Sequence, residues 1–271
     1  MKVCSFNING LRARLHQLEQ VMDRYDLVGL QEIKVDDSQF PLADVIATGC
    51  RSVVHHGQKG HYGVANLAKA AYLSAQKGFA WRDELEQKRF VQTSYATDAG
   101  ELFLLNGYFP QGESRKHPTK FAAKERYYQD LLQHLQQLPK DALYLVVGDM
   151  NVAHQDIDIG IGEINRKRWL SAGKCAFLPE EREWLQALLD LGLVDAFRHC
   201  YPEKAALSWF DYRSRAFEDD PRRGLRIDYL LLSPALAPRL TDSGIDIDIR
   251  AMEKPSDHAP VWAELDLELI S

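Results

Sequence analysis

The sequence predicts an α/β fold, a four-layer sandwich of two stacked mixed β-sheets with helices on the outer faces. Apolar, strand-like segments recur along the whole chain, and residues 51–108 contain one after another with scarcely a helix among them. Such a run is typical of hairpins in mixed sheets. Helical patterns are few, so the strands are too numerous for one open parallel sheet, in which each crossover needs a connecting helix.

Periodicity assigns the individual elements in chain order. Leu11, Leu15, Leu18 and Met22 follow a helical spacing, and Pro139 ends a second, longer helical pattern. We expect helices at residues 11–24, 42–47, 121–138 and 180–189. We expect strands at residues 2–6, 27–31, 64–67, 90–95, 102–105, 143–147, 207–210, 227–232, 245–249 and 261–265. Residues 152–173 have neither pattern and form an excursion.

Size and composition limit the class of protein. With 271 residues and 45% hydrophobic content, the chain can bury an ordinary core, and no composition shift or linker divides it. We therefore expect one domain over residues 1–271. No apolar run approaches the roughly 18 residues of a membrane span, and the first residues turn polar too early for a signal peptide. The sequence predicts a cytosolic protein without a membrane partner.

Cysteine spacing and net charge exclude further classes. Cys4, Cys50, Cys175 and Cys200 form neither a CxxC motif nor a zinc-type pattern, so we expect reduced structural thiols. The formal net charge of -6 argues against binding a polyanion through bulk charge. A nucleic acid would have to be bound by local basic patches.

The apolar run at residues 143–147 ends at Gly148-Asp149-Met150-Asn151, which predicts a buried strand with polar residues at its mouth. Side chains alternate along an extended chain, so Asp149 and Asn151 point to the same side. A carboxylate beside an amide suits a water molecule held for attack on an anionic group. A lone Asp-x-Asn is more often an Asx turn, so this interpretation depends on the rest of the chain.

Polar residues follow nearly every predicted strand, which indicates a shared polar site at one rim of the sandwich. These residues are Asn7, Asn9, Gln31, Glu32, Asn106, Tyr108, Asp149, Asn151, Asp228, Asp257 and His258. Carboxylates and amides without a cysteine or a histidine pair form a hard-oxygen donor set, which favours Mg²⁺ or Mn²⁺ over zinc. Glu32 is the first candidate ligand, with a solvated strand-end charge as the alternative.

Pro255 and Pro260 stiffen the segment that carries Asp257 and His258. Neighbouring residues of an extended chain face opposite ways, so Asp257 does not orient His258. Asp228 is the candidate for that role, because a carboxylate partner would keep the imidazole charged and aimed at phosphate. His258 alone would more often be a structural histidine, and Tyr108 would more often be a half-buried core aromatic.

Basic residues gather in separate loops. Each loop alone is more often a solvated face, but together, in an acidic protein, they fit a phosphate-backbone track. The candidate DNA contacts among them are Arg115, Lys116, Arg166, Lys167, Arg168 and Arg226. Trp209, Phe210 and Leu225 add apolar residues near Asp228, either as core or as a pocket for a sugar that has lost its base.

Six ordered motifs resemble the bacterial exonuclease III family, the abasic-site endonuclease branch of the endonuclease/exonuclease/phosphatase superfamily. They are Ser-Phe-Asn-Ile-Asn-Gly-Leu-Arg-Ala-Arg at 5–14, Leu-Gln-Glu at 30–32, Asn-Gly-Tyr-Phe-Pro-Gln-Gly-Glu-Ser at 106–114, Gly-Asp-Met-Asn at 148–151, Leu-Arg-Ile-Asp at 225–228 and Ser-Asp-His-Ala-Pro-Val at 256–261. Residues 165–170 and 177–184 resemble that branch in particular. The match covers almost the whole chain.

The resemblance implies the sandwich fold described above and assigns a role to each rim residue. Glu32 binds the divalent metal, Tyr108 and His258 contact the phosphate, Asp149 handles the nucleophilic water, Asn151 orients it, and Asp228 pairs with His258. Asn7 and Asp257 are implied as supporting metal or neighbouring residues, and Asp149 and Asn151 as further candidates for the metal set.

The resemblance also implies the reaction and its partners. The expected enzyme is a monomeric Mg²⁺-dependent DNA repair nuclease, with Mn²⁺ as a substitute, that cleaves duplex DNA 5′ to abasic sites. It would also remove nucleotides or blocking groups from recessed or blocked 3′ ends. Two alternatives remain: a phosphoesterase acting on a substrate other than nucleic acid, and a nonenzymatic RNA-binding regulator of the same fold.

Overall fold

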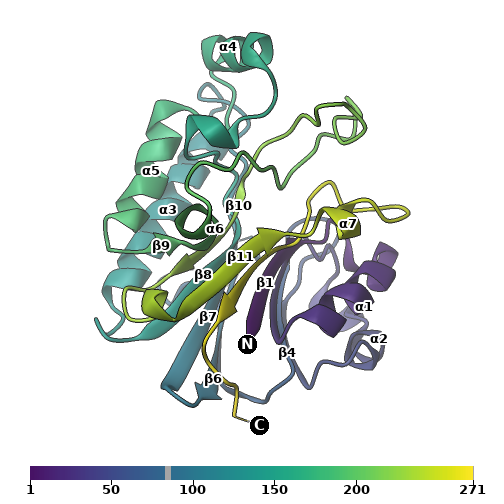
Figure 1. Cartoon of the computed structure of the whole chain (residues 1–271), viewed down its shortest axis with the longest axis vertical. Helices are drawn as coiled ribbons and strands as arrows, with labels where there is room; N and C mark the ends of the chain where they lie inside the picture. Colours follow the sequence, from purple (N-terminus) through teal and green to yellow (C-terminus); the bar gives the residue numbers. More distant parts are fainter. Residues whose placement is uncertain (83–86, 271) are drawn as a thin grey trace.

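The computed structural model describes residues 1–82 and 87–270, in which two six-stranded sheets lie face to face with helices outside them (Figure 1). The predicted α/β sandwich of two mixed sheets is therefore confirmed. Among the described residues, no helix has both the length and the apolar character needed to cross a membrane. All four cysteines are free thiols, as expected.

The first sheet has the strand order β11-β12-β1-β2-β4-β3. Its strands are β1 (Lys2–Asn7), β2 (Leu27–Gln31), β3 (Ser52–His56), β4 (Val64–Ala68), β11 (Leu240–Ile245) and β12 (Val261–Leu265). Only β1 and β2 pair in parallel, and the other neighbours are antiparallel. A connection through α1 (Leu15–Arg24) joins the parallel pair, as parallel strands require.

The second sheet has the order β5-β6-β7-β8-β10-β9. Its strands are β5 (Tyr72–Lys77), β6 (Phe90–Thr97), β7 (Gly100–Tyr108), β8 (Leu143–Asp149), β9 (Val194–Asp195) and β10 (Asp228–Leu232). The parallel pair here is β7 and β8. The strands β12-β1-β2-β4-β3 of the first sheet and β10-β8-β7-β6-β5 of the second share one pattern of pairings: antiparallel, parallel, antiparallel, antiparallel. Strand β1 therefore has the same position in the first sheet as β8 has in the second.

Alternation along the central strands separates three apolar layers. In β8, Tyr144 and Val146 pack outward against α3 (Lys120–Gln136) and α5 (Pro179–Leu189), while Leu145 and Val147 pack inward against the other sheet. The outer face of the first sheet is covered by α1 and α2 (Leu42–Ala47). Because side chains alternate along β8, the side chain of Asp149 also points into the layer between the sheets.

The chain ends lie together at one end of the sandwich, where the Met1 amine donates to the carbonyls of Leu265 and Leu267 (Figure 1). Strand β1 runs away from that end and finishes at Asn7. Each parallel pair places its two carboxyl ends side by side, and the bonds from Asn7 to Asp149 and from Gln31 to Asn106 bring the ends of β1, β2, β7 and β8 together at the opposite rim.

Four expectations for individual elements need correction. Residues 245–249 are not a strand: β11 ends at Ile245 and α7 (Ile247–Arg250) follows, because Pro260 stands next on the partner strand and has no N–H to extend the ladder. Residues 207–210 form only isolated bridges at Trp209. The helix expected at 11–24 is a 3₁₀ turn followed by α1. The excursion contains α4 (Glu163–Ala172), and a short α6 (Ala196–Cys200) follows β9.

Candidate active site

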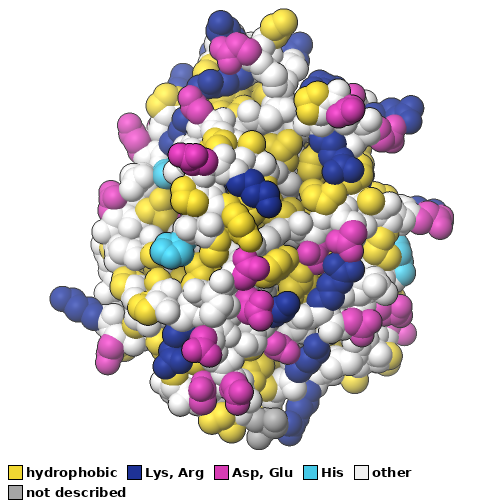
Figure 2. All heavy atoms as spheres, viewed as in Figure 1, with side chains coloured by type: hydrophobic (Ala, Val, Ile, Leu, Met, Phe, Trp, Pro, Cys, Tyr) yellow, Lys and Arg dark blue, Asp and Glu magenta, His cyan; other side chains and the backbone are white. Residues whose placement is uncertain are grey.

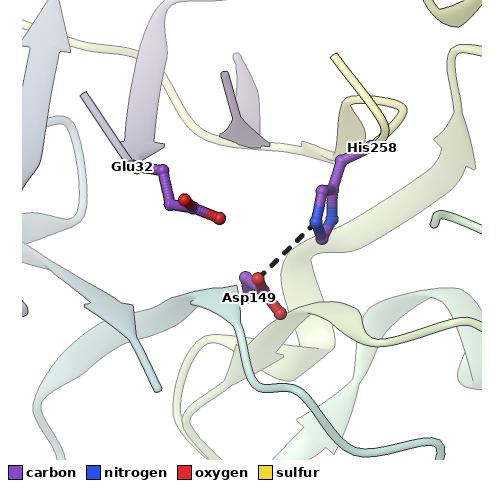
Figure 3. Close-up of side chains that lie close together, drawn as sticks. All are labelled: Glu32, Asp149 and His258. Atoms are coloured by element: carbon purple, nitrogen blue, oxygen red, sulfur yellow. Dashed lines mark ion pairs between the residues drawn. The ribbon is translucent and has the colours of Figure 1, made fainter. Parts of the chain in front are cut away.

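Three ionisable side chains meet at the polar rim. Glu32 follows β2, Asp149 ends β8 and His258 precedes β12, and their candidate ligand atoms lie within 4.8 Å of one another. Figure 3 shows the three side chains pointing toward a common centre, with His258 Nε2 3.7 Å from Asp149 Oδ2. The structure thus brings together residues 226 positions apart in sequence (258 − 32).

Asn7, at the end of β1, joins the two carboxylates of this group. Its Nδ2 donates to Glu32 Oε1 and to Asp149 Oδ2, each at 2.9 Å. Its Oδ1 accepts from the main-chain N–H of Asn9 at 3.1 Å. The Asn7 side chain therefore orients both carboxylates, and its Oδ1, which accepts one hydrogen bond, retains a second lone pair.

The pKa of the Asp149 carboxyl group lies near neutral pH. It is 2% exposed, and burial, followed by repulsion from Asp228 and Glu32, raises its pKa to about 7 against the opposing charge of His258 and the Asn7 hydrogen bond. A carboxylate with a pKa near the working pH can both take up and release a proton, as a general base must.

His258 is held by Asp228, as expected from the sequence. Its Nδ1 lies 2.8 Å from Asp228 Oδ2 and 3.0 Å from Oδ1, and Ser208 Oγ donates to Oδ2 at 2.6 Å. Burial favours the neutral ring, but the carboxylates of Asp228 and Asp149 together raise the His258 pKa to about 10. At neutral pH the ring is therefore an imidazolium whose Nε2–H faces the centre of the site.

Glu32 is ionised although it is mostly buried. Burial raises its pKa, but the Lys34 ammonium, 2.9 Å from Oε2, and the Asn7 amide lower it more, so the net shift is downward. With His258 protonated, the donors that remain are the carboxylate oxygens of Glu32 and Asp149. A set of oxygen donors favours a hard divalent cation over zinc.

Asn151 and Tyr108 border the same centre. The Asn151 backbone N–H donates to Asp149 Oδ1 at 3.0 Å, and its Nδ2 donates to the Phe109 carbonyl at 3.0 Å, which leaves Oδ1 facing away from those partners. Burial, Glu32 and Asp149 keep the Tyr108 pKa well above its usual value, so the phenol retains its proton. Both side chains can therefore form hydrogen bonds to a ligand.

Asp257 does not join the group of Glu32, Asp149 and His258. Its Oδ1 accepts from Asn9 Nδ2 at 2.8 Å, and its Oδ2 accepts from Trp209 Nε1 at 3.0 Å. Direct ligation by Asp257 is thus not supported by the geometry. The carboxylate instead fixes Asn9, in the loop that follows β1, and the ring of Trp209.

The candidate DNA contacts divide into accessible and buried residues. Arg115, Lys116, Lys167 and Arg168 are exposed, and Arg166 and Trp209 are partly exposed. Figure 2 shows basic side chains around α4 and the neighbouring loops at the upper end, interleaved with acidic ones. These assignments remain predictions.

Arg226, Phe210 and Leu225 require a correction, because each is only 1% exposed. The Arg226 guanidinium is enclosed by two carboxylates, with Nε 2.8 Å from Asp158 Oδ1 and Nη2 2.7 Å from Asp195 Oδ2. Its charge stabilises the fold and is not available to a phosphate. Leu225 belongs to a small core cluster, and Phe210 packs edge-on against Phe217.

Sequence reasoning missed three residues at the rim. Lys34 stands two positions after Glu32, and alternation could have placed the two side chains on one side. Ser208, which bonds Asp228, gave no local signal because its partner is 20 residues away. Arg89 was also missed, and its guanidinium lies 4.7 Å from the Tyr108 ring centroid and 4.0 Å from that of Tyr62.

The fold and the site define a class of protein. A buried carboxylate near its titration point, an imidazolium and an ionised carboxylate facing one centre are typical of metal-dependent phosphoester hydrolases. The comparison with known proteins agrees: the chain belongs to the endonuclease/exonuclease/phosphatase family, whose model matches residues 4–258. The family resemblance found in the motifs is thus confirmed.

Two curated relatives align over nearly all of this chain. Exodeoxyribonuclease III of Haemophilus influenzae is 56% identical over 268 residues, covering 97% of this chain and 99% of that protein. The DNA repair nuclease APEX1 of Danio rerio is 32% identical over 271 residues, covering 96% of this chain and 81% of that protein.

Solved structures give the same result. The Neisseria 3′ phosphatase NExo bound to a product DNA hairpin superposes with a TM-score of 0.87 at 34% identity, covering 98% of this chain and 99% of that chain. An AP endonuclease from Archaeoglobus fulgidus has a TM-score of 0.87 at 30% identity, with the same coverage.

Proposed function

We propose that this chain is a DNA repair nuclease that hydrolyses phosphodiesters of duplex DNA 5′ to abasic sites, with 3′-to-5′ exonuclease and 3′-phosphatase activity. The observation that carries the proposal is the meeting of Glu32, Asp149 and His258 at one rim. The names of the relatives support the substrate, since they include an exodeoxyribonuclease, an AP endonuclease and a 3′ phosphatase.

Each side chain then has a part in the hydrolysis. Asp149, with its pKa near 7, accepts the proton of the attacking water, and Asn151 orients that water through its free Oδ1. The His258 imidazolium, kept charged by Asp228, stabilises negative charge on the phosphate. Tyr108 donates its phenolic proton to another phosphate oxygen.

A divalent cation completes the site, with Mg²⁺ as the natural ion and Mn²⁺ as a substitute. Glu32 would hold it directly, with Asp149 as the second oxygen donor and with Asn7, Asn151 and Asp257 supporting the surrounding geometry. When bound, the cation neutralises charge on the phosphate and on the departing O3′. The ionised Glu32 carboxylate and the other oxygen donors beside it support this choice of metal.

All three activities follow from one bond-breaking event. Cleavage 5′ to an abasic sugar, removal of a 3′ nucleotide and removal of a 3′ phosphate each open a P–O3′ bond and leave a 3′-hydroxyl. A single centre can therefore act on internal abasic sites and on recessed or blocked 3′ ends. Arg115, Lys116, Arg166, Lys167, Arg168 and Trp209 are the accessible candidates for contact with the duplex.

We further propose that residues 1–271 form one domain that acts as a monomer in the bacterial cytoplasm. The rim residues all come from one chain, and the Met1 amine bonds the segment after β12, which supports a single folding unit. The bacterial relative supports the cellular location.

An end-labelled duplex with one abasic analogue tests the function. Incubated with Mg²⁺, it should yield a product ending 5′ to the analogue, and EDTA should abolish cleavage. Tight RNA binding without metal-dependent cleavage would instead favour a regulator of the same fold. Hydrolysis of a soluble phosphoester that duplex DNA does not inhibit would favour a different phosphoesterase.

A further inference from the structure

Two fully buried charges lie behind the site and take no part in the hydrolysis described above. Lys124 of α3 and Glu181 of α5 are each 0% exposed, and Nζ lies 2.5 Å from Oε1. Burying an ion pair removes both charges from water, and a buried pair contributes little more stability than apolar residues of the same size. Its retention here calls for a role beyond stability.

The Lys124 ammonium connects the segments that follow the two central strands of the second sheet. Besides Glu181, Nζ donates to the carbonyl of Asn151 at 2.9 Å and to that of Gln111 at 3.4 Å. These carbonyls follow β8 and β7, respectively. An ammonium has three donors, so this set uses its full capacity.

Glu181 extends the connection to the start of α5. Its second oxygen, Oε2, accepts from the main-chain N–H groups of Ala176 and Leu178, each at 2.8 Å. The carboxylate is thereby fixed on a rigid helix start, and it fixes the ammonium in turn. The site-facing segment is held from outside the sheet by two helices.

The residue at the centre of this arrangement has an unfavourable backbone conformation. Asn151 has a φ of 54°, in the left-handed region, which is uncommon for residues with a side chain although asparagine enters it more readily than most. Three bonds hold it there: its N–H on Asp149, its Nδ2 on Phe109 and its carbonyl on Lys124. A strained conformation persists only where its surroundings over-determine it.

We propose that Lys124, paired with Glu181, is a positioning residue that holds the Asn151 carbonyl and thereby fixes the orientation of the Asn151 side chain at the polar rim. The proposal rests on the proposed function and adds a residue to it. Without the ammonium, Asn151 relaxes toward an ordinary φ, and its amide turns away from the water it orients. Small misplacements of such a group cost far more in turnover than in substrate binding.

The test uses the double substitution Lys124→Met with Glu181→Gln, which removes both charges and leaves neither one unpaired. Single-turnover cleavage and binding are measured on a duplex with one abasic analogue. We expect kcat to fall by about 10- to 100-fold with the dissociation constant for DNA within about two-fold of wild type. A double variant with wild-type kcat would overturn the proposal.

A cycle with Asn151→Ala separates positioning from a general loss of structure. If Lys124 acts through Asn151, adding the double substitution to Asn151→Ala should lower kcat by no more than about two-fold further. If the fold-losses in kcat of the double substitution and of Asn151→Ala multiply in full, Lys124 acts elsewhere and the proposal is overturned. Where the double variant does not fold, Lys124→Leu with Glu181→Gln replaces it, since a shorter apolar side chain also removes the bond to the Asn151 carbonyl, and the same cycle and the same two outcomes apply.

Asp130→Asn provides a matched control. Asp130 also lies on α3 and forms an ion pair, with Arg82, but none of the hydrogen bonds and ion pairs described for Asp130 reaches Asn151. Its substitution should leave kcat unchanged. Failure of the proposed function is distinguishable, because the wild-type protein would then not cleave the duplex at all, whereas failure of the positioning role leaves wild type and double variant equally active.

Discussion

Asn7 Nδ2, at the end of β1, donates a hydrogen bond of 2.9 Å to Asp149 Oδ2, at the end of β8 in the other sheet. This bond joins the two sheets at the rim where the site lies. The same nitrogen donates to Glu32, so one amide holds two like-charged groups in fixed positions. The distance between the proposed base and the proposed metal ligand is therefore set by a residue that performs neither role.

Replacing Asn7 tests this arrangement through the pH dependence of turnover. The Asn7 hydrogen bonds lower the pKa of both Glu32 and Asp149, so Asn7→Ala should raise both. Because Asp149 acts as a base only when deprotonated, the acidic limb of kcat should move upward. Losing a hydrogen bond to a charged group, worth about 1.5 kcal/mol, corresponds to about one pH unit. An unchanged pH profile would remove Asn7 from this role.

Asp149 itself should be indispensable to the chemical step. Asp149→Asn keeps the shape of the side chain but cannot accept the proton of the attacking water. We expect kcat to fall by about three orders of magnitude or more, while the affinity for duplex DNA changes little. Single-turnover cleavage and equilibrium binding on the same abasic duplex measure the two effects. Turnover near the wild-type rate would assign the base to another residue.

Much of this site was predictable because local periodicity fixes side-chain direction. The period of two in β8 places Asp149 and Val147 on the inner face, and polar residues after successive strands indicate a common rim. The pairing of Asp228 with His258 followed from chemistry alone, since a lone adjacent acid could not reach the ring. These conclusions need no knowledge of the strand order.

The residues that sequence reasoning misplaced depend on distant partners. Arg226 resembled a surface charge until the fold brought Asp158 and Asp195 against it, 68 and 31 residues away. Residues 245–249 alternate like a strand, but Pro260 on the neighbouring strand ends the ladder at Ile245. Periodicity along one segment does not reveal which residue will stand opposite it.

The buried Arg226 should stabilise the fold and not the complex with DNA. Arg226→Met leaves the Asp158 carboxylate buried with one guanidinium fewer, and removing one partner of a buried pair costs about 3–5 kcal/mol of unfolding free energy. Urea titration measures the loss. The exposed Arg168 provides the comparison: Arg168→Met should change stability by less than about 0.5 kcal/mol. Equal stability of the two variants would contradict the assignment of Arg226 to the core.

The pairing of Asp228 with His258 should determine the basic limit of activity. Asp228 is the principal group that raises the His258 pKa to about 10, opposing the effect of burial. In Asp228→Asn the amide no longer stabilises the imidazolium, so the ring loses its proton at a lower pH. The positive charge that His258 presents to the phosphate is then lost at a lower pH. The basic limb of kcat should therefore move downward by about one pH unit or more. Histidine ring resonances in NMR spectra, followed against pH, report the pKa directly. Ser208→Ala, which removes the hydroxyl bond to the Asp228 carboxylate but keeps its charge, should leave the His258 pKa much closer to the wild-type value than Asp228→Asn does. An imidazole that titrates at the same pH in Asp228→Asn and in wild type would show that Asp228 orients the ring without holding its charge.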